Sequence, residues 1–229
     1  MDKVFIHSND SDTADRRSPR MARPCHKRGS RIAAASLALA LALAVSSAQA
    51  QSDLAYEAYK QGAYATALRE LRPLAEQGNA VAKFLLGNMY ETGGKGVSQN
   101  DGQAAFWYRK AAEQGYALAQ SRLGVLYAGG KGVPQDDRQS AAWFQRAAAQ
   151  GDTQAQLLLG WAYVIGKGVP EDDVQGYAWL NLAAAQGDEK AKEVRDSIRR
   201  LMTREQIAEG RKLSRELSAQ ITSQGETIP

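Results

Sequence analysis

The stretch WYRKAAEQG at Trp107–Gly115 returns twice further along the chain. It recurs as WFQRAAAQG at Trp143–Gly151 and as WLNLAAAQG at Trp179–Gly187, and each copy begins 36 residues after the previous one. A fixed period of this length is typical of stacked helical units, each of which buries its apolar face against its neighbours. The recurring residues are therefore interpreted as packing and turn positions. Arg109 and Lys110 change from copy to copy and are interpreted as loosely constrained positions.

A second block recurs between these copies, beginning at Leu86, Leu123 and Leu159. It contains Leu-Gly, two variable residues and Tyr, followed by a Gly-Lys-Gly-Val turn, with apolar residues spaced as one face of a helix. Glycine costs about 1 kcal/mol relative to alanine inside a helix, so a glycine repeated there predicts close helix contact. Each unit is thus predicted to be a pair of helices. The repeated structural positions are Gly87, Tyr90, Trp107, Gly124, Tyr127, Trp143, Gly160, Tyr163 and Trp179.

The second helix of each unit is predicted to start after Asp101, Asp137 and Asp173, whose carboxylates would accept backbone N–H bonds at the helix start. Pairs such as Asp136-Asp137 and Asp172-Asp173 have an alternative interpretation as a metal or acid–base site. Their recurrence in successive units favours capping instead. The repeated tryptophans each precede an alanine by four residues, so they share its helix face and are predicted to be buried.

Atypical units flank the three close copies. Residues 51–79 resemble a plain tetratricopeptide unit, because a short Gln-Gly-Ala-Tyr turn replaces the glycine loop. Residues 188–229 begin in register as another first helix, but Asp196 and Arg199 stand where Gly and Tyr are expected. Those charges predict a capping unit, which a solenoid needs to close its last apolar face.

A final helix is predicted after the cap. Thr203–Gln206 match a capping box, in which two side chains satisfy each other's backbone N–H groups. Ile207, Leu213 and Leu217 give this helix an apolar stripe. The polar tail that begins at Ile221 is expected to fray.

The first fifty residues follow the pattern of a secretion signal. A basic stretch leads into the apolar segment Ile32–Val45, and an Ala-Gln-Ala motif then predicts cleavage after Ala50. Translation is suspected to start at Met21. The apolar run of 14 residues is shorter than the roughly 18 that a spanning helix needs, so an uncleaved anchor is the weaker alternative. The mature protein is expected to be periplasmic or secreted, with membrane contact only through the transient signal peptide.

Removal of residues 1–50 changes the charge balance and the available chemistry. That segment holds 8 of the 29 Lys and Arg and 4 of the 25 Asp and Glu, which leaves 21 of each in residues 51–229. A neutral domain gives no support to nucleic-acid binding. The segment also holds Cys25, His7 and His26, so residues 51–229 have no thiol or imidazole for catalysis, disulfides or metal ligation. No cofactor, metal or catalytic residue is predicted.

The repeated units resemble the Sel-one-like repeat family, a subfamily of tetratricopeptide repeats with the pattern A-x-x-x-L-G-x-x-Y-x-x-G-x-G-V-x-x-D and then W-[YF]-x-x-A-A-x-x-G. Three units match it, at residues 80–117, 118–153 and 154–187. The departures are one inserted residue in the first unit, Ser98 in place of Pro, and Leu180 in place of an aromatic. The resemblance implies an all-α fold, a right-handed α-solenoid of antiparallel helix pairs that binds protein or peptide partners on its concave face.

Positions that vary between units are predicted to face solvent on the first helices, which line the concave side of such solenoids. In the third unit Leu158, Trp161 and Val164 make this face apolar. Two interpretations stay open: the C-terminal helices bury the patch, or it is a hot spot for an incoming peptide, because Trp and Arg are enriched at such sites. The candidate partner-binding residues are Leu85, Asn88, Arg122, Val125, Leu158 and Trp161.

The favoured function is a non-catalytic adaptor or regulator that binds protein partners in the bacterial envelope. The alternative is a cell-wall-active hydrolase or β-lactam-binding enzyme, which would depend on carboxylates such as Glu113 or Glu171. The turn lysines Lys95, Lys131 and Lys167 suggest a cationic ladder for an anionic polymer, although turn lysines are usually only solvated.

Overall fold

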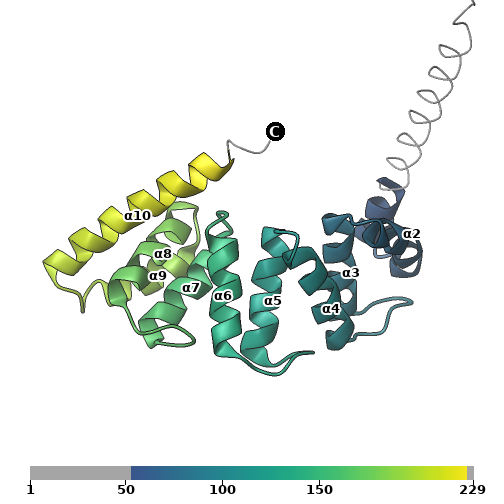
Figure 1. Ribbon diagram of the computed structural model, residues 1–229, viewed down its shortest axis with the longest axis horizontal. Helices are drawn as coiled ribbons and strands as arrows, with labels where there is room; N and C mark the ends of the chain where they lie inside the picture. Colours follow the sequence, from purple (N-terminus) through teal and green to yellow (C-terminus); the bar gives the residue numbers. More distant parts are fainter. Residues whose placement is uncertain (1–52, 226–229) are drawn as a thin grey trace, which may run out of the picture. The chain divides into compact units, whose positions relative to one another are not determined.

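The computed structural model describes residues 53–225, so the proposed signal peptide and the alternative start at Met21 lie outside the described residues. Residues 53–60 are helical, and nine further helices follow within the described part of the chain (Figure 1). They are α2 (Tyr64–Glu76), α3 (Ala80–Thr92), α4 (Asp101–Ala112), α5 (Ala117–Gly129), α6 (Asp137–Ala148), α7 (Thr153–Ile165), α8 (Asp173–Ala185), α9 (Glu189–Ile198) and α10 (Arg204–Gly225).

From α2 to α9 each helix packs against the next along the chain, and α10 packs on α8. The closest packing joins α3 with α4, α5 with α6, and α7 with α8, and somewhat fewer contacts join α4 with α5 and α6 with α7. Figure 1 shows these pairs following one another side by side. The all-α solenoid of antiparallel helix pairs predicted from the repeats is therefore confirmed.

The repeated helix glycines mark the places where the two helices of a pair touch. A Cβ placed on Gly87, Gly124 or Gly160 would lie only 2.5, 2.6 or 2.7 Å from a side chain of the second helix. Carbon atoms in contact normally lie 3.5–4.0 Å apart, so no side chain fits at these positions. The prediction of close helix contact is confirmed, and it explains why glycine is used here despite its cost to the helix.

The helix N-caps lie one residue before the predicted positions. Asn100, Asp136 and Asp172 have extended backbones, and their side chains accept backbone N–H groups of α4, α6 and α8. The Asp136 carboxylate, for example, accepts two such bonds at 3.0 Å. The following aspartates already belong to the helices, where they still interact favourably with the helix dipole. The prediction is thus wrong by one residue at Asp101, Asp137 and Asp173.

The repeated tryptophans are not equally covered. Trp143 and Trp179 are buried, as predicted, in successive core clusters. Trp107 is only partly buried and lies against the N-terminal core with its ring edge-on to Phe106 at a centroid distance of 5.1 Å. The prediction of burial therefore holds fully for two of the three tryptophans and in part for Trp107.

Side-chain hydrogen bonds join the start of the first helix to the end of the second helix within each repeat, and the repeat pattern did not predict them. The Gln at each Gln-Gly turn meets a polar side chain near the start of the preceding first helix, in each case at 2.8 Å. Buried Gln156 also donates to a backbone carbonyl of α6 at 3.2 Å. The three contacts pair Lys83 with Gln114, Gln120 with Gln150, and Gln156 with Gln186.

The C-terminal helices close the last repeat. The α10 helix packs on α8 (yellow in Figure 1). The predicted capping box is confirmed: the Thr203 backbone N–H donates to Gln206 at 2.8 Å, and the Gln206 backbone N–H donates to the Thr203 hydroxyl at 3.2 Å. Fraying from Ile221 is not observed, because α10 continues to Gly225 and Ile221 packs against a buried cluster.

Candidate functional site

The six candidate partner-binding residues do not all face solvent. Leu85 is only 6% exposed, because the N-terminal helical residues 53–60 pack on the same core cluster. The prediction of solvent exposure is therefore wrong for Leu85. Asn88 is half-buried, and its side-chain oxygen accepts a hydrogen bond from the Tyr59 hydroxyl at 2.7 Å. The other four candidates line two neighbouring pockets.

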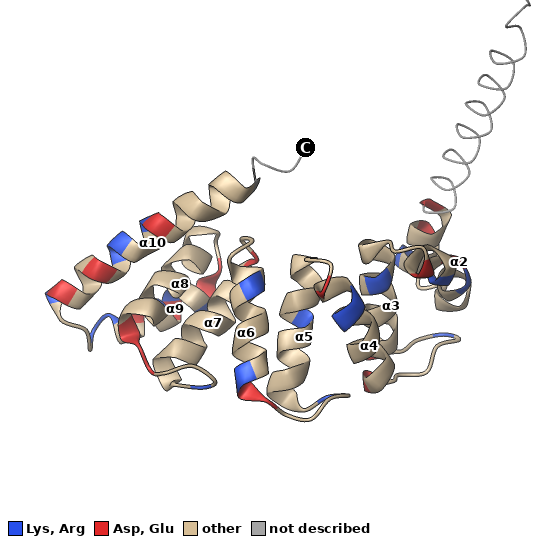
Figure 2. Ribbon diagram, in the orientation of Figure 1, with Lys and Arg blue, Asp and Glu red and all other residues tan. Residues whose placement is uncertain are grey.

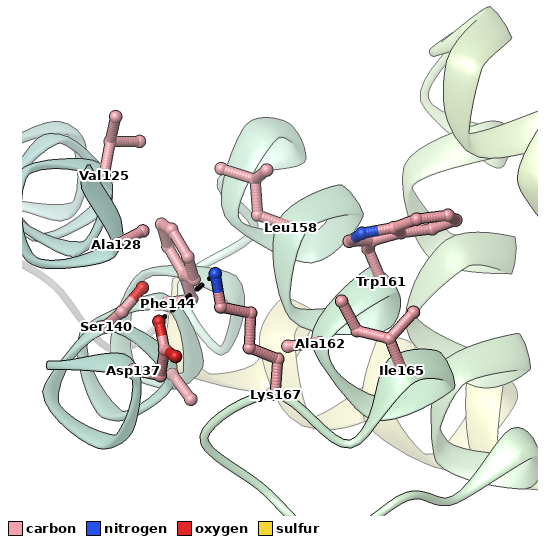
Figure 3. A pocket seen from close by; sticks show the side chains of 11 residues that line it. Val125, Ala128, Asp137, Ser140, Phe144, Leu158, Trp161, Ala162, Ile165 and Lys167 are labelled. Atoms are coloured by element: carbon pink, nitrogen blue, oxygen red, sulfur yellow. Dashed lines mark ion pairs between the residues drawn. The ribbon is translucent and has the colours of Figure 1, made fainter.

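An apolar pocket lies between the second and third repeats and is shown in Figure 3. It has a volume of about 230 Å³ and combines side chains from α5, α6 and α7. Val125, Leu158 and Trp161 line it, as does the buried Phe144. The Phe144 ring also contacts the position of Gly124, so the helix-pair contact shapes the pocket. We call this the apolar pocket.

Trp161 remains open to solvent. Its side chain is 45% exposed, and the described C-terminal helix α10 packs on α8 instead of covering it. The hypothesis that the C-terminal helices bury the apolar patch is therefore wrong for Trp161, whereas Leu158 and Val164 are half-buried against clusters that residues of α10 also join. Ile165, which is also 45% exposed, takes the place predicted for Val164. Val164 instead turns toward α8, where its Cγ2 would lie 2.7 Å from a Cβ on Gly176.

An ion pair forms the polar edge of the apolar pocket. The Lys167 ammonium lies 3.4 Å from an oxygen of the Asp137 carboxylate, and Figure 3 shows the two groups facing each other. The pair joins the start of α6 to the turn after α7 and so links two repeats. Both charges of the pair therefore have a partner within the protein.

A second pocket adjoins the first. Its volume is about 530 Å³, and its lining includes Phe84, Leu118, Arg122, Val125 and Gln154. Val125 lines both pockets, so the two are neighbours: α3, α5 and α7 contribute to the second, and α5, α6 and α7 to the first. Arg122 is exposed, and we call its surroundings the arginine pocket.

Two tyrosine hydroxyls lie within electrostatic reach of Arg122. The Tyr108 hydroxyl donates a hydrogen bond of 2.6 Å to the Glu91 carboxylate. Burial, followed by the interaction with Glu91, raises the pKa of Tyr108 above its usual value, while the nearby Arg122 guanidinium lowers it. Burial also raises the pKa of Tyr59. These tyrosines are therefore neutral hydrogen-bonding groups at physiological pH.

The turn lysines do not form a row of unpaired cations. Lys95 and Lys131 are exposed, whereas Lys167 is paired with Asp137. Figure 2 shows acidic and basic residues interspersed over the helices. The arrangement does not support the cationic ladder.

The described residues bring no catalytic constellation together. No group of three or more His, Cys, Asp or Glu side chains with metal-binding geometry occurs in residues 53–225. Glu113 follows α4 and Glu171 lies in the loop before α8, so these exposed carboxylates belong to different repeats. The hydrolase alternative gains no support from this placement. None of the described helices combines the length and apolar character needed to cross a membrane.

These features define a class: a helical-repeat solenoid whose first helices carry an open apolar pocket beside an exposed arginine. The pattern of the Sel1 repeat matches residues 80–116, 117–152 and 153–188. Residues 80–188 therefore belong to the Sel1 repeat family, whose members, like other tetratricopeptide-like repeats, generally mediate protein–protein interaction.

Solved structures include several similar chains. A Sel1 repeat protein from Oxalobacter formigenes is 35% identical with a TM-score of 0.57, and the match covers 60% of this chain and 56% of that one. A protective antigen of uropathogenic Escherichia coli with an SLR fold is 29% identical with a TM-score of 0.47, over 80% of this chain and 49% of that one. Cysteine-rich protein B of Helicobacter pylori is 25% identical with a TM-score of 0.44, over 56% and 91%.

The chain thus spans about half the length of the first two of these proteins. No curated protein sequence matches this chain.

Proposed function

We propose that this protein is an exported, non-catalytic scaffold that binds a protein or peptide partner in the bacterial envelope. The apolar pocket carries the proposal, because a large aromatic side chain that is 45% exposed at a pocket is characteristic of a binding hot spot. The pocket lies between the first helices α5 and α7, with α6 forming part of its wall, and solenoid repeats use their extended concave surfaces for ligands. Export is supported by the basic, apolar and small-residue pattern of residues 1–50.

Replacement of Trp161 by alanine tests the binding proposal. The variant should lose capture of crosslinked envelope proteins while its free energy of unfolding falls by less than the roughly 3–5 kcal/mol that truncation of a fully buried Trp costs, because nearly half of this residue is exposed. The matched control is Phe106→Ala, which removes an aromatic side chain of similar exposure, 48%, from α4. Capture that survives Trp161→Ala, or falls equally in both variants, contradicts the proposal. A large loss of stability would place Trp161 in the core.

Two measurements test export and the absence of catalysis. Mass spectrometry of the protein from the envelope fraction should find a mature N-terminus at Gln51, directly after the predicted cleavage site. An intact Met1 or Met21 would overturn the localisation. Incubation with peptidoglycan or a β-lactam should leave both unchanged, and turnover of either would refute a purely non-catalytic scaffold.

A further inference from the structure

We infer that the partner segment is an extended peptide in which a carboxylate lies close to a large apolar side chain. The carboxylate pairs with Arg122 in the arginine pocket, and the apolar side chain enters the apolar pocket beside Leu158 and Trp161. This inference rests on the proposed function, and it adds the chemistry of the ligand.

The positive charge of Arg122 is available to a ligand. Arg122 is exposed, and it takes part in no ion pair within residues 53–225. Its charge acts to lower the pKa of Tyr59 and Tyr108, against the larger effect of burial. A lone cation at the edge of an apolar pocket is complementary to an anionic group of a partner.

The acidic residues around the two pockets already have partners. Glu91 accepts the Tyr108 hydroxyl at 2.6 Å, and Asp152 caps α7 by accepting a backbone N–H at 2.7 Å. Asp137 is held by Lys167. These carboxylates leave the Arg122 side chain to an external anion. A long phosphate chain is a poorer match, because nucleic-acid binding needs several cations along a path and Arg122 is the one unpaired cation among the residues that line the two pockets.

The geometry of the helices sets the spacing of the two ligand groups. Arg122 and Val125 are three residues apart and lie on one face of α5, and Val125 lines both pockets. Side chains at positions i and i+2 of an extended peptide point the same way and lie about 7 Å apart. An acidic residue two positions from an aromatic residue therefore suits both pockets.

A set of four labelled peptides tests this chemistry with the purified full chain by fluorescence anisotropy. The probe STETFTETS places Glu two residues to either side of Phe, so it serves both chain directions. In the comparison peptides, Gln replaces Glu (STQTFTQTS), Lys replaces Glu (STKTFTKTS), or Ala replaces Phe (STETATETS). The protein variants are Arg122→Glu and, as a control with the same charge change on the exposed face of α10, Arg215→Glu.

Wild-type protein should bind STETFTETS about two- to fivefold more tightly than the Gln peptide, because a solvent-exposed ion pair contributes modestly. The Ala peptide should bind at least tenfold more weakly, since the apolar anchor is lost. Arg122→Glu should reverse the preference so that the Lys peptide binds more tightly than the Glu peptide, whereas Arg215→Glu should keep the wild-type order. A merely structural effect of the substitution would weaken all peptides together.

The results separate failure of this inference from failure of the proposed function. If Arg122→Glu keeps the wild-type order of Glu over Lys peptides while Trp161→Ala still abolishes Phe-peptide binding, the carboxylate chemistry is wrong and the scaffold proposal stands. If the four peptides bind equally, or none binds at millimolar concentration, the acidic–apolar ligand is refuted. If the wild-type chain forms a dimer that Arg122→Glu dissociates, the occupant is a second copy, which also refutes the peptide.

Discussion

Replacement of Gly160 by alanine should destabilise the third repeat, although alanine is the better helix former. A Cβ at this position would lie 2.7 Å from Leu180 Cγ and 3.1 Å from both the Gly176 carbonyl oxygen and the Leu180 backbone nitrogen. Leu180 is fully buried, and backbone atoms cannot rotate away from the new methyl group. Helices α7 and α8 must therefore move apart by about 1 Å to restore normal carbon contacts.

Two opposing terms set the size of this effect. Overpacking of a core lowers the free energy of unfolding by about 1–3 kcal/mol. We place this site at the upper end of that range because the backbone atoms in contact cannot rotate away. The gain in helix propensity offsets about 1 kcal/mol. The net loss is about 2 kcal/mol, which corresponds to a fall in Tm of roughly 4–8 °C for a domain of this size.

Thermal unfolding followed by circular dichroism measures this loss. Gly102→Ala is the matched control, because Gly102 is an exposed residue of α4 whose new Cβ would meet only the Asn100 side chain, at 3.4 Å. This control should leave stability unchanged or raise it by up to about 1 kcal/mol. If Gly160→Ala proves as stable as wild type or as Gly102→Ala, then close helix contact is not the reason for the repeated glycine.

Three further predictions follow from the contacts between elements. Tyr108→Phe should be less stable than wild type at neutral pH, but the gap should narrow above about pH 10. Because the pKa of buried Tyr108 is raised in the folded protein, the neutral hydroxyl stabilises the fold fully below the pKa of the unfolded tyrosine, and this contribution is lost as the pH rises above it. Urea unfolding of both proteins across about pH 7–12 measures the gap. Thr203→Ala removes half of the capping box and should cost about 1 kcal/mol, with faster amide exchange at the start of α10, whereas uniform exchange would contradict a local cap. Gln156→Leu leaves a buried backbone carbonyl without its donor and should lower the free energy of unfolding by about 1–3 kcal/mol in chemical denaturation. Gln186→Ala removes only the exposed partner of Gln156 and should cost less, so equal losses for the two variants would contradict this prediction.

One position interpreted as loosely constrained makes a specific contact. The Arg109 guanidinium donates to the Tyr127 hydroxyl at 2.9 Å and lies 5.9 Å from the centre of its ring. Arg72 and Tyr90 make the equivalent contact at 3.2 Å one repeat earlier. Variation between copies therefore does not establish that a side chain lacks a partner. It shows only that the partner is not required in every repeat.

The candidate site was predictable only in part. Val125, Leu158 and Trp161 were found because they vary at one helix spacing, and the structure places them around one pocket. Ile165 carried the same signal, since it lies four residues after Trp161 and seven after Leu158, but its neighbour Val164 was predicted instead. A difference of one residue on a helix turns a side chain by about 100° and moves it from the open face to the α8 contact.

The repeat period, the helix pairs and the glycine contacts were determined by the sequence alone. These features depend on local spacing, and three copies in register separate the packing positions from the variable ones. The tertiary structure decided which variable positions are open. Leu85 is covered by residues 53–60, Lys167 is neutralised by Asp137, and Arg122 is left beside an apolar pocket. Each outcome depends on groups brought together from distant parts of the chain, whose packing no local periodicity specifies.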